Sequence, residues 1–209
     1  MIEVHQKNSL LTIIGLIFII FLYENVYVVD IISNSMIPIL KKGKKVIYVN
    51  RKFFKLRKGA IIIFEKNGQL LVKRIVGLSN DTISYSSQKL ILNEVPINED
   101  YLKNNLDYSF ISPFNSDYIY VNEYIVPFEG YYVEINPESL ARYKQLIEDI
   151  EQTKITQKGN RFFLRNSPFQ NYIFPTDCYY VLGDNRNNSI DSRTYGAIPE
   201  KNIRGVVIF

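Results

Sequence analysis

The longest uncharged stretch of the chain lies close to its N-terminus. Residues Asn8 to Tyr23 are mostly Leu, Ile and Phe, and Lys7 and Glu24 flank them. A helix of this length spans roughly 24 Å at about 1.5 Å per residue, which is short of the roughly 30 Å hydrocarbon core of a bilayer. Charged side chains at both ends can extend to the lipid headgroups and make up the difference. The pattern predicts an N-terminal transmembrane helix over residues 1–24.

A cleaved signal peptide has an apolar segment of similar length and is the alternative to a retained anchor. Cleavage requires a pair of small residues soon after the apolar run. Glu24 to Asp30 contains no such pair, and the first alanine of the chain is Ala60. We therefore expect the anchor to be retained. The basic residues from Lys41 to Lys58 favour the cytoplasmic side by charge counting, but they belong to an expected folded domain, so charge alone leaves the orientation open. They also suit contact with anionic lipid headgroups.

Beyond this run, short apolar or alternating segments are separated by turn residues. Lys45 to Asn50 alternates among β-branched and aromatic residues, and Asn67-Gly68 precedes the apolar segment Leu70 to Gly77. Thr82–Tyr85 and Lys89–Leu92 have the pattern of a hairpin. Further strands are expected at Ala60–Phe64, Tyr118–Val126, Tyr131–Ile135, Cys178–Leu182 and Gly205–Phe209. Sequential short strands of this kind predict a mainly β fold with an antiparallel sheet or a barrel-like core.

One segment has the periodicity of an amphipathic helix. Asn136 is a favourable N-cap, and Pro137 suits the first helical position. One helical face carries Leu140, Tyr143, Ile147 and Ile150, whereas the charged residues expected on the other faces are Glu138, Lys144, Glu148 and Glu151. A second hairpin is expected where Gly159-Asn160 separates Lys154–Lys158 from Arg161–Leu164.

Composition limits the chemistry that this chain can perform. A length of 209 residues with 46% hydrophobic content suits one folded domain with a real core. The net charge of +4 does not require a nucleic-acid partner. A single cysteine, Cys178, excludes an internal disulfide and suits a small buried side chain. One cysteine and one histidine disfavour a zinc site, and the sequence has no glycine-rich phosphate loop. We expect no metal, no cofactor and no nucleic acid.

A serine-rich segment, Ser33-Asn34-Ser35-Met36-Ile37-Pro38, follows the apolar run. A serine hydroxyl is a weak nucleophile and requires a base. The only histidine, His5, lies before the apolar run, which excludes a Ser-His-Asp triad. The best candidate base is Lys73, because it interrupts the apolar segment Leu70 to Gly77, where loss of hydration can neutralise an amine.

A third motif, Gly183-Asp184-Asn185-Arg186-Asn187-Asn188-Ser189-Ile190-Asp191-Ser192-Arg193, follows an expected buried strand. Together with the Ser35 and Lys73 segments, and in the same order, it resembles the conserved boxes of the type I signal peptidases. The resemblance covers roughly residues 30–100 and 175–205. Departures from the family pattern are found at Asn34, Ile39, Ala60, Asn187 and Tyr195. None of them removes a group expected to take part in catalysis.

The resemblance implies a serine endopeptidase that uses no cofactor. Ser35 would be the nucleophile and Lys73 its general base. The Ser33 hydroxyl and the Ser35 backbone N–H would stabilise the oxyanion, and Ser189 would orient the lysine. Asp191 and Arg193 would form a structural ion pair that shapes the loop carrying Ser189, and Asp184, Asn185, Arg186 and Arg74 are expected to be structural too. The residues that would line a pocket for small substrate side chains are Val29, Ile31, Leu40 and Val72, for which a purely core role is an open alternative.

The same resemblance implies a domain organisation and a location. Residues 1–24 would be the membrane anchor, residues 25–123 and 176–209 the β-rich catalytic core, and residues 124–175 an inserted non-catalytic segment with one helix. The fold would be mainly β, with an antiparallel, barrel-like catalytic core, an N-terminal transmembrane helix and a small α/β insertion. The catalytic domain would lie on the outer face of the cytoplasmic membrane, with preprotein signal peptides and membrane lipids as its partners.

Three other functions remain open from the sequence. A self-cleaving repressor-type protease shares the Ser/Lys dyad, but the anchor and the Gly183 to Arg193 motif disfavour it. A catalytically silent, membrane-tethered β domain could bind peptides or assemble a complex, although the presence of both Ser35 and Lys73 disfavours this. A membrane-surface binding module would use the basic residues between Lys41 and Lys58 and would not need Ser35.

Overall fold

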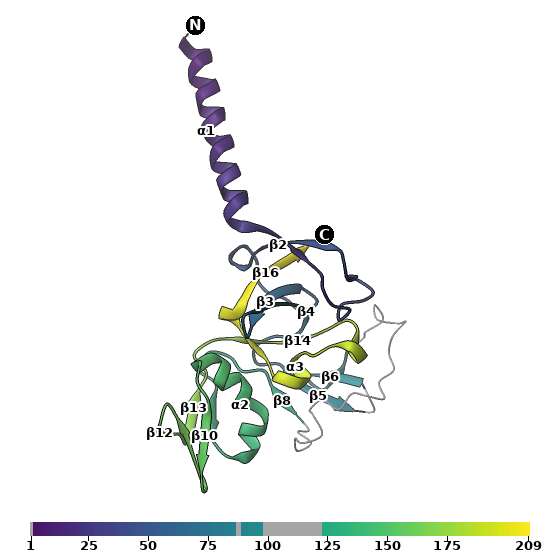
Figure 1. Ribbon diagram of the computed structural model, residues 1–209, viewed down its shortest axis with the longest axis vertical. Helices are drawn as coiled ribbons and strands as arrows, with labels where there is room; N and C mark the ends of the chain where they lie inside the picture. Colours follow the sequence, from purple (N-terminus) through teal and green to yellow (C-terminus); the bar gives the residue numbers. More distant parts are fainter. Residues whose placement is uncertain (1, 87–88, 98–122) are drawn as a thin grey trace.

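A computed structural model describes residues 2–86, 89–97 and 123–209 of the chain (Figure 1). The helices are α1 (Ile2–Asn25), α2 (Pro137–Glu151) and α3 (Ser192–Tyr195), with one-turn 3-10 helices at Arg51–Phe53, Arg186–Asn188 and Glu200–Asn202. The strands are β1 (Val26–Asp30), β2 (Lys45–Asn50), β3 (Ile61–Lys66), β4 (Gln69–Gly77), β5 (Thr82–Ser86), β6 (Lys89–Leu92), β7 (Val95–Pro96), β8 (Tyr124–Ile125), β9 (Tyr132–Glu134), β10 (Ile155–Lys158), β11 (Arg161–Leu164), β12 (Ser167–Pro168), β13 (Asn171–Ile173), β14 (Cys178–Leu182), β15 (Ile198–Pro199) and β16 (Ile203–Ile208).

Antiparallel pairing dominates the fold, as the sequence predicts. Within the described residues, seven strands form one sheet in the order β1-β2-β16-β3-β4-β14-β15, and every neighbouring pair in it is antiparallel. The last strand, β16, lies between β2 and β3, so the C-terminal segment joins the middle of the sheet. Strands β5 and β6 form the predicted hairpin, and β10 and β11 form the second one.

Strand β3 is buried on both faces of the sheet, which explains its unbroken apolar sequence. Ile61 and Ile63 belong to an inner cluster made up of Ile31, Met36, Leu40, Val46, Tyr48, Ile61, Ile63, Val72 and Val207. Ile62 and Phe64 point the other way, because successive strand residues face opposite sides. Their outer cluster consists of Leu56, Ile62, Phe64, Ile75, Tyr179, Val181, Tyr195, Ile198 and Ile203.

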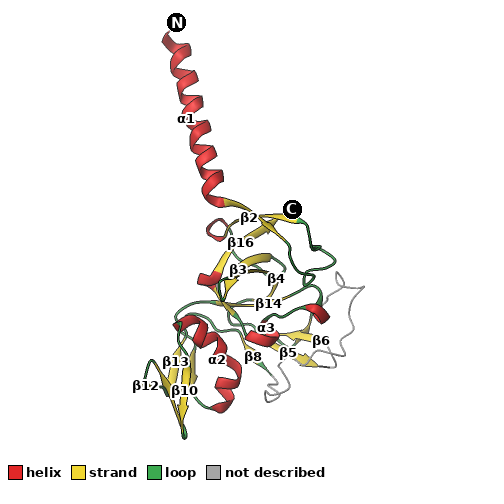
Figure 2. Cartoon of the chain, viewed as in Figure 1, coloured by secondary structure: helices red, strands yellow, loops and turns green. Residues whose placement is uncertain are grey.

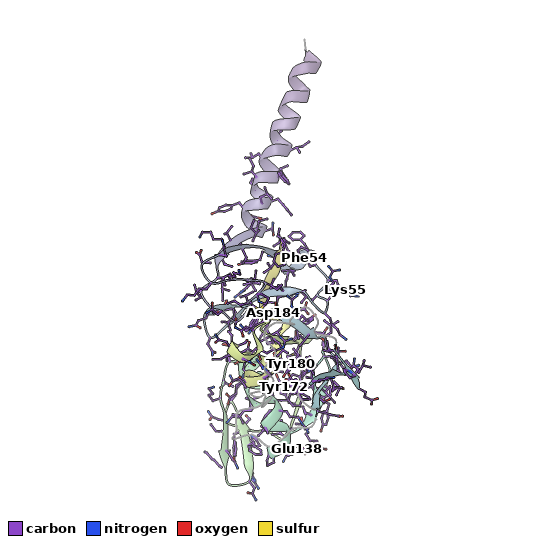
Figure 3. The ribbon with its side chains drawn as sticks, turned by 90° about the vertical axis from the view of Figure 1, so that its right-hand side faces the viewer. Phe54, Lys55, Glu138, Tyr172, Tyr180 and Asp184 are labelled. Carbon is purple, nitrogen blue, oxygen red and sulfur yellow. The ribbon has the colours of Figure 1, made fainter. Side chains whose placement is uncertain are left out.

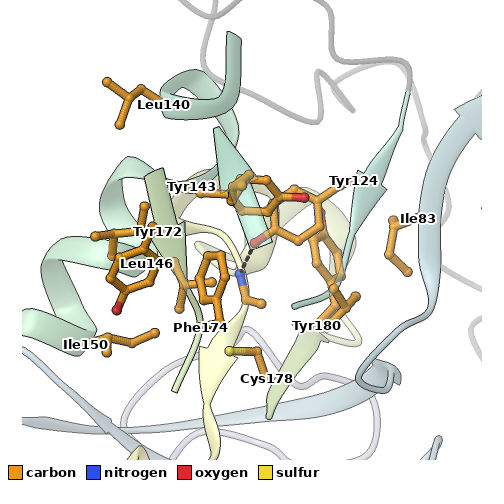
Figure 4. Packing of buried hydrophobic residues seen from close by; sticks show 14 of the residues in the cluster. Ile83, Tyr124, Leu140, Tyr143, Leu146, Ile150, Tyr172, Phe174, Cys178 and Tyr180 are labelled. Carbon is orange, nitrogen blue, oxygen red and sulfur yellow. Dashed lines mark hydrogen bonds between the residues drawn. The ribbon is translucent and has the colours of Figure 1, made fainter. Parts of the chain in front are cut away.

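A third hydrophobic cluster joins segment 124–175 to the strands around it (Figure 4). It includes Leu140, Tyr143, Leu146, Ile147 and Ile150 of α2, together with Tyr124, Phe174, Cys178, Tyr180 and Ile83. The Tyr124 hydroxyl accepts a hydrogen bond from the Ala197 backbone N–H at 3.0 Å, drawn as a dashed line in Figure 4. Cys178 is fully buried here as a free thiol. The segment therefore shares its core with β5, β6 and β14.

Helix α2 begins as the sequence predicts. The Asn136 side chain accepts the Ser139 backbone N–H, the Ser139 hydroxyl accepts the Asn136 backbone N–H, and Pro137 occupies the first turn. One residue of the expected polar faces is placed differently. Glu148 is buried, and its carboxylate accepts the Ile155 backbone N–H at 2.9 Å and the Lys154 ammonium at 2.8 Å. It is buried because it has partners where the chain leaves the helix, which helical periodicity alone does not reveal.

Helix α1 projects away from the β-rich body, while α2 and strands β10–β13 lie at the opposite end (Figures 1 and 2). The apolar side chains from Ile13 to Leu22 are exposed. Among the described residues, none of the helices combines the length and the hydropathy needed to cross a bilayer. The helix itself is present where the sequence predicts one, and its insertion into a membrane stays a prediction.

Two other expectations differ from the observed strands. Of the strand expected at Tyr118–Val126, residues 118–122 lie outside the described part of the chain, and β8 covers only Tyr124–Ile125. Strand β1 has no strand pattern of its own in the sequence, because Val26–Asp30 directly follows the apolar run, and the sequence predicts only a strand edge in the residues before Ser35. It pairs with β2 along its whole length, from Val26 opposite Val49 to Asp30 opposite Lys45.

Candidate active site

The segment after β1 carries the predicted nucleophile, Ser35, and the predicted oxyanion donor, Ser33. Met36 is fully buried in the inner cluster, which attaches this segment to the core. On its other side, the Ser35 carbonyl accepts the Asn185 backbone N–H at 2.9 Å, and the Asn34 carbonyl accepts the Asn185 side-chain amide at 3.1 Å. The serines are therefore held between the hydrophobic core and the loop that follows β14. Ser35 is buried, whereas Ser33 is exposed.

Lys73 comes from the middle of β4, where it lies opposite Ile62 of β3. Its Nζ lies 2.9 Å from the Ser35 Oγ, and it donates a hydrogen bond of 2.9 Å to the Val72 carbonyl. The Ser33 Oγ lies 3.1 Å from the Ser35 Oγ. The structure thus brings together three residues that the sequence separates by up to 40 positions, and it puts the predicted base within hydrogen-bond distance of the predicted nucleophile.

The surroundings of Lys73 disfavour its charged form. The residue is only 4% exposed, and burial lowers the pKa of its amine. Among the nearby charges, the Asp191 carboxylate raises this pKa and the Arg193 guanidinium lowers it. Burial is the largest effect, and the pKa of Lys73 is lowered overall. A lysine serves as a base only when it is neutral, and this burial favours that state.

Asp191 and Arg193 form a buried ion pair within the loop of residues 183–193. The Arg193 Nε donates to Asp191 Oδ1 at 2.8 Å, and its Nη2 donates to Oδ2 at 2.9 Å. Asp191 also accepts the Gly183 backbone N–H at 3.0 Å, and Arg193 donates to the Arg186 carbonyl at 2.6 Å. The pair therefore connects both ends of the loop to its middle and limits the conformations that the loop can adopt.

Ser189 lies close to the backbone of Ser35 but forms no hydrogen bond with Lys73. A Cβ added to Gly183 would lie 2.2 Å from the Ser189 Oγ and 2.6 Å from the Ser35 carbonyl oxygen, so only glycine fits between them. The Ser189 hydroxyl is buried and has no hydrogen-bond partner among the described residues. The predicted bond from Ser189 to the Lys73 amine is not formed in this structure, and its orienting role stays a prediction.

A second buried ion pair, between Arg74 and Asp184, is not predicted by the sequence. Arg74 follows Lys73 directly and binds Asp184 through two hydrogen bonds, Nε to Oδ1 at 2.8 Å and Nη2 to Oδ2 at 2.6 Å. Arg74 also donates to the Gly59 carbonyl at 2.7 Å. Asp184 lies in the middle of the body, between Phe54 near α1 and Glu138 at the far end (Figure 3). The sequence marks both residues as structural, but no local pattern pairs two residues that lie 110 positions apart.

A groove of about 630 Å³ opens beside Lys73. It is lined by Val29, Asp30, Ile31, Ile32, Ser33, Ile63, Gln69, Leu70, Leu71, Val72 and Lys73. Three of the four predicted pocket residues are among them. Leu40, the fourth, does not line the groove and is buried in the inner cluster beside Ile31 and Val72.

Two strand edges border this groove. In the described part of the chain, strand β1 pairs only with β2, at one end of the sheet order. Strand β14 pairs with β4 only from Arg74 onward, so the Gln69–Lys73 part of β4 has no strand on that side within the described residues. Because β1 and β4 line the same groove although three strands separate them in the sheet order, the sheet curves strongly around the inner cluster.

No group of three or more His, Cys, Asp or Glu residues in the described part of the chain could hold a metal ion.

Comparison with known proteins shows the family of this chain. The family described as "Signal peptidase, peptidase S26" matches residues 2–209 of the chain. The chain belongs to this family. It is 33% identical to a signal peptidase I of Buchnera aphidicola subsp. Baizongia pistaciae over 73% of the chain, and 30% identical to that of Buchnera aphidicola subsp. Schizaphis graminum over 95% of the chain. It is 29% identical to signal peptidase IB of Staphylococcus aureus strain COL over 85% of the chain.

The chain matches only part of each of these relatives. The matched regions span 54%, 71% and 73% of their respective lengths. A solved structure of a signal peptidase I from Enterococcus faecalis is 25% identical, with a TM-score of 0.40, and the match covers 74% of this chain and 98% of that one.

The Arg74–Asp184 pair leads to a prediction about stability. Replacing Asp184 with Leu removes a fully buried carboxylate that accepts two hydrogen bonds from Arg74, and breaking a buried ion pair in this way costs about 3–5 kcal/mol. We expect Asp184→Leu to lower the free energy of unfolding by that amount in chemical denaturation. Glu65→Leu is the matched control, because the Glu65–Arg204 pair is half exposed and pairs of that kind contribute about 1 kcal/mol or less. Equal losses in the two variants would contradict this assignment.

Proposed function

We propose that the chain is a membrane-bound serine endopeptidase that removes signal peptides from exported preproteins. The observation that carries this proposal is the 2.9 Å separation between the Lys73 Nζ and the Ser35 Oγ in a buried setting. Membership of the signal peptidase family supports the same reaction class. A free strand edge on each side of the adjoining groove provides a place for an extended peptide.

The proposed reaction proceeds through a covalent acyl-enzyme. The neutral Lys73 amine accepts the Ser35 hydroxyl proton while the Ser35 Oγ bonds to the carbonyl carbon of the scissile peptide. The C–N bond then breaks, and the Lys73 ammonium returns the proton to the departing amine of the mature protein. A water molecule attacks the ester in the second half. Lys73 accepts a proton of that water and passes it to the Ser35 Oγ as the ester bond breaks, so the signal peptide leaves with a free carboxylate and the dyad returns to its starting state.

The tetrahedral intermediates carry a negative oxygen that requires fixed donors. In the proposed arrangement these donors are the Ser35 backbone N–H and the Ser33 hydroxyl. Ser33 Oγ lies 3.1 Å from Ser35 Oγ, and its segment is fixed by Asn185 and by the buried Met36. Because these supports are made before the substrate arrives, the donors need little rearrangement during the reaction.

The groove suits a peptide that binds as an added strand. Such a peptide would form main-chain hydrogen bonds with the free edges of β1 and of Gln69–Lys73, and alternate side chains would point toward the groove floor. Val29, Ile31 and Val72 line that floor. Large aliphatic side chains there leave room for small substrate side chains, which by family resemblance stand one and three residues before the cut. Leu40 does not line the groove and would support its lining by packing against Ile31 in the inner cluster.

Helix α1 is proposed to hold the enzyme at the membrane. Its apolar residues from Ile13 to Leu22 are exposed and lie outside the three hydrophobic clusters described above. The helix projects from the body (Figure 2). Strand β1 follows the helix without a linker, and Ser35 comes ten residues after Asn25. This short connection would keep the groove near the bilayer surface, where the end of a signal peptide emerges. The catalytic domain would face the outside of the cytoplasmic membrane, with lipids as its second partner.

The direct test is cleavage of a model preprotein by the purified full chain in detergent. We expect cleavage after a small residue, and no detectable cleavage by Ser35→Ala or Lys73→Ala, because each lacks one member of the dyad. Ser33→Ala should lower kcat about 100-fold with little change in KM, as expected for the loss of one oxyanion donor.

Two exposed residues provide matched controls. Ser167→Ala and Lys55→Ala remove the same groups from exposed positions outside the groove lining and should keep full activity (Figure 3 labels Lys55). Cleavage by Ser35→Ala or by Lys73→Ala would contradict the proposed role of that residue. Loss of activity in a control variant would point to a general folding defect.

The rate should also depend on pH in a defined direction. Only the neutral amine accepts a proton, so kcat/KM should rise about tenfold per pH unit below the pKa of Lys73 and level off above it. Because burial lowers that pKa, the plateau should begin below the ordinary lysine value of about 10.4. The His5→Gln variant should keep the same acid limb, since His5 is the only histidine. A rate that is independent of pH throughout, or an acid limb that disappears in His5→Gln, would rule out a lysine base.

A further inference from the structure

The groove beside Lys73 contains one acidic residue. Apart from Lys73 itself, Asp30 is the only charged residue among those that line it, and the others are mostly aliphatic. The Asp30 side chain is 61% exposed, so it is accessible to a bound peptide. It lies at the end of β1, three residues before Ser33 and five before Ser35. A carboxylate in this place is not needed for the proposed chemistry at the dyad.

Alternation along β1 determines which substrate side chains Asp30 can meet. Val29 and Ile31 pack into the inner cluster, while Asp30 and Ile32 are exposed on the opposite side. An added strand follows the same alternation, so the substrate residues that point away from the groove floor share the side of Asp30. Directly opposed side chains on neighbouring strands have Cβ atoms about 5 Å apart, which is close enough for ion pairing.

Among the described residues, the one ion pair that Asp30 forms is open to solvent. Lys45 donates to Asp30 Oδ1 at 2.8 Å from the directly opposite position on β2, but its side chain is 68% exposed. Exposed pairs of this kind contribute little to stability. The backbone around Asp30 is fixed more firmly, because Ile31 exchanges hydrogen bonds with the Lys44 carbonyl at 2.8 Å and the Gly43 N–H at 2.7 Å.

We infer that Asp30 is a specificity-determining residue that favours preproteins with a basic side chain four residues before the cleaved bond. The inference rests on the proposed function and adds a charge preference to it. An extended chain advances about 3.3 Å per residue, so the three residues from Ser33 to Asp30 correspond to about 10 Å, the distance from the first to the fourth residue before the cut. If the first and third residues point to the floor, the fourth points toward Asp30.

The test compares peptides that differ at one position. Three otherwise identical substrates carry Lys, Gln or Glu four residues before the cut, and kcat/KM is measured for each with the full chain in detergent at low salt. We expect Lys to be favoured over Gln, and Gln over Glu, by about two- to fivefold at each step, as for an exposed ion pair. The preference should shrink at high ionic strength, because salt screens exposed charges.

Two substitutions of Asp30 assign the preference to this residue. In Asp30→Asn, the kcat/KM ratios among the three peptides should fall to about one. In Asp30→Lys, the order should reverse, with the Glu peptide cleaved best.

Lys45 offers a test that leaves Asp30 in place. Lys45→Gln removes the competing ammonium and should increase the preference for the Lys peptide. Lys44→Gln is its matched control, because it removes the same charge from the neighbouring residue and leaves the Lys45–Asp30 ion pair in place, and it should leave the ratios as they are.

The outcomes separate this inference from the proposed function. Equal cleavage of all three peptides, or a preference that persists in Asp30→Asn, would overturn the role of Asp30 while leaving the peptidase intact. If the parent protein cleaves none of the peptides and no model preprotein, the proposed function fails and this inference fails with it. An equal gain in preference for Lys44→Gln and Lys45→Gln would show a general charge effect and would also overturn it.

Discussion

A lysine amine kept out of water beside a serine hydroxyl is the arrangement on which the rest of this structure depends. Lys73 has to be buried to be a base, and a buried amine lowers stability unless it stays neutral and hydrogen-bonded. Strand β4 meets both needs, because Val72 and Ile75 beside Lys73 are buried and the Val72 carbonyl accepts a hydrogen bond from the Lys73 amine. The curvature of the sheet then leaves one side of Lys73 open to the groove.

The 183–193 loop holds the segment that contains Asn34 and Ser35 in place opposite this strand. Its first residues bind that segment through Asn185, and the Arg74–Asp184 pair joins the same loop to β4 immediately after Lys73. The two sides of the dyad are therefore connected to each other through one short stretch of chain. This explains why the loop contains so many charged and amide side chains although none of them has a part in the proposed proton transfer.

Much of the fold follows from local sequence patterns. The alternation in β2, the turn residues before β4, and the cap of α2 at Asn136 each act over a few residues, and the structure agrees with them. Strand β1 could not be found in this way, since Val26–Asp30 continues an apolar run and becomes a strand only by pairing with β2. The burial of Glu148 likewise depends on partners beyond the helix, at Lys154 and Ile155.

The candidate site shows the same division between local and long-range information. Residue chemistry and family resemblance led to Ser33, Ser35 and Lys73 as a group, because a serine without a histidine requires another base. The Arg74–Asp184 pair and the close contact of Gly183 with Ser189 were not predictable, because they depend on how distant segments pack. The position of Leu40 behind the groove, not in its lining, has the same origin.

The protonation state of Lys73 is the central claim, and an NMR titration of its side-chain nitrogen tests it most directly. The full chain would be labelled with ¹⁵N-lysine in detergent, and the Lys73 signal assigned by its loss in Lys73→Arg. We expect this nitrogen to titrate clearly below the ordinary lysine value of about 10.4, apart from the exposed lysines, because burial lowers its pKa. Titration of Lys73 together with the exposed lysines would contradict the account.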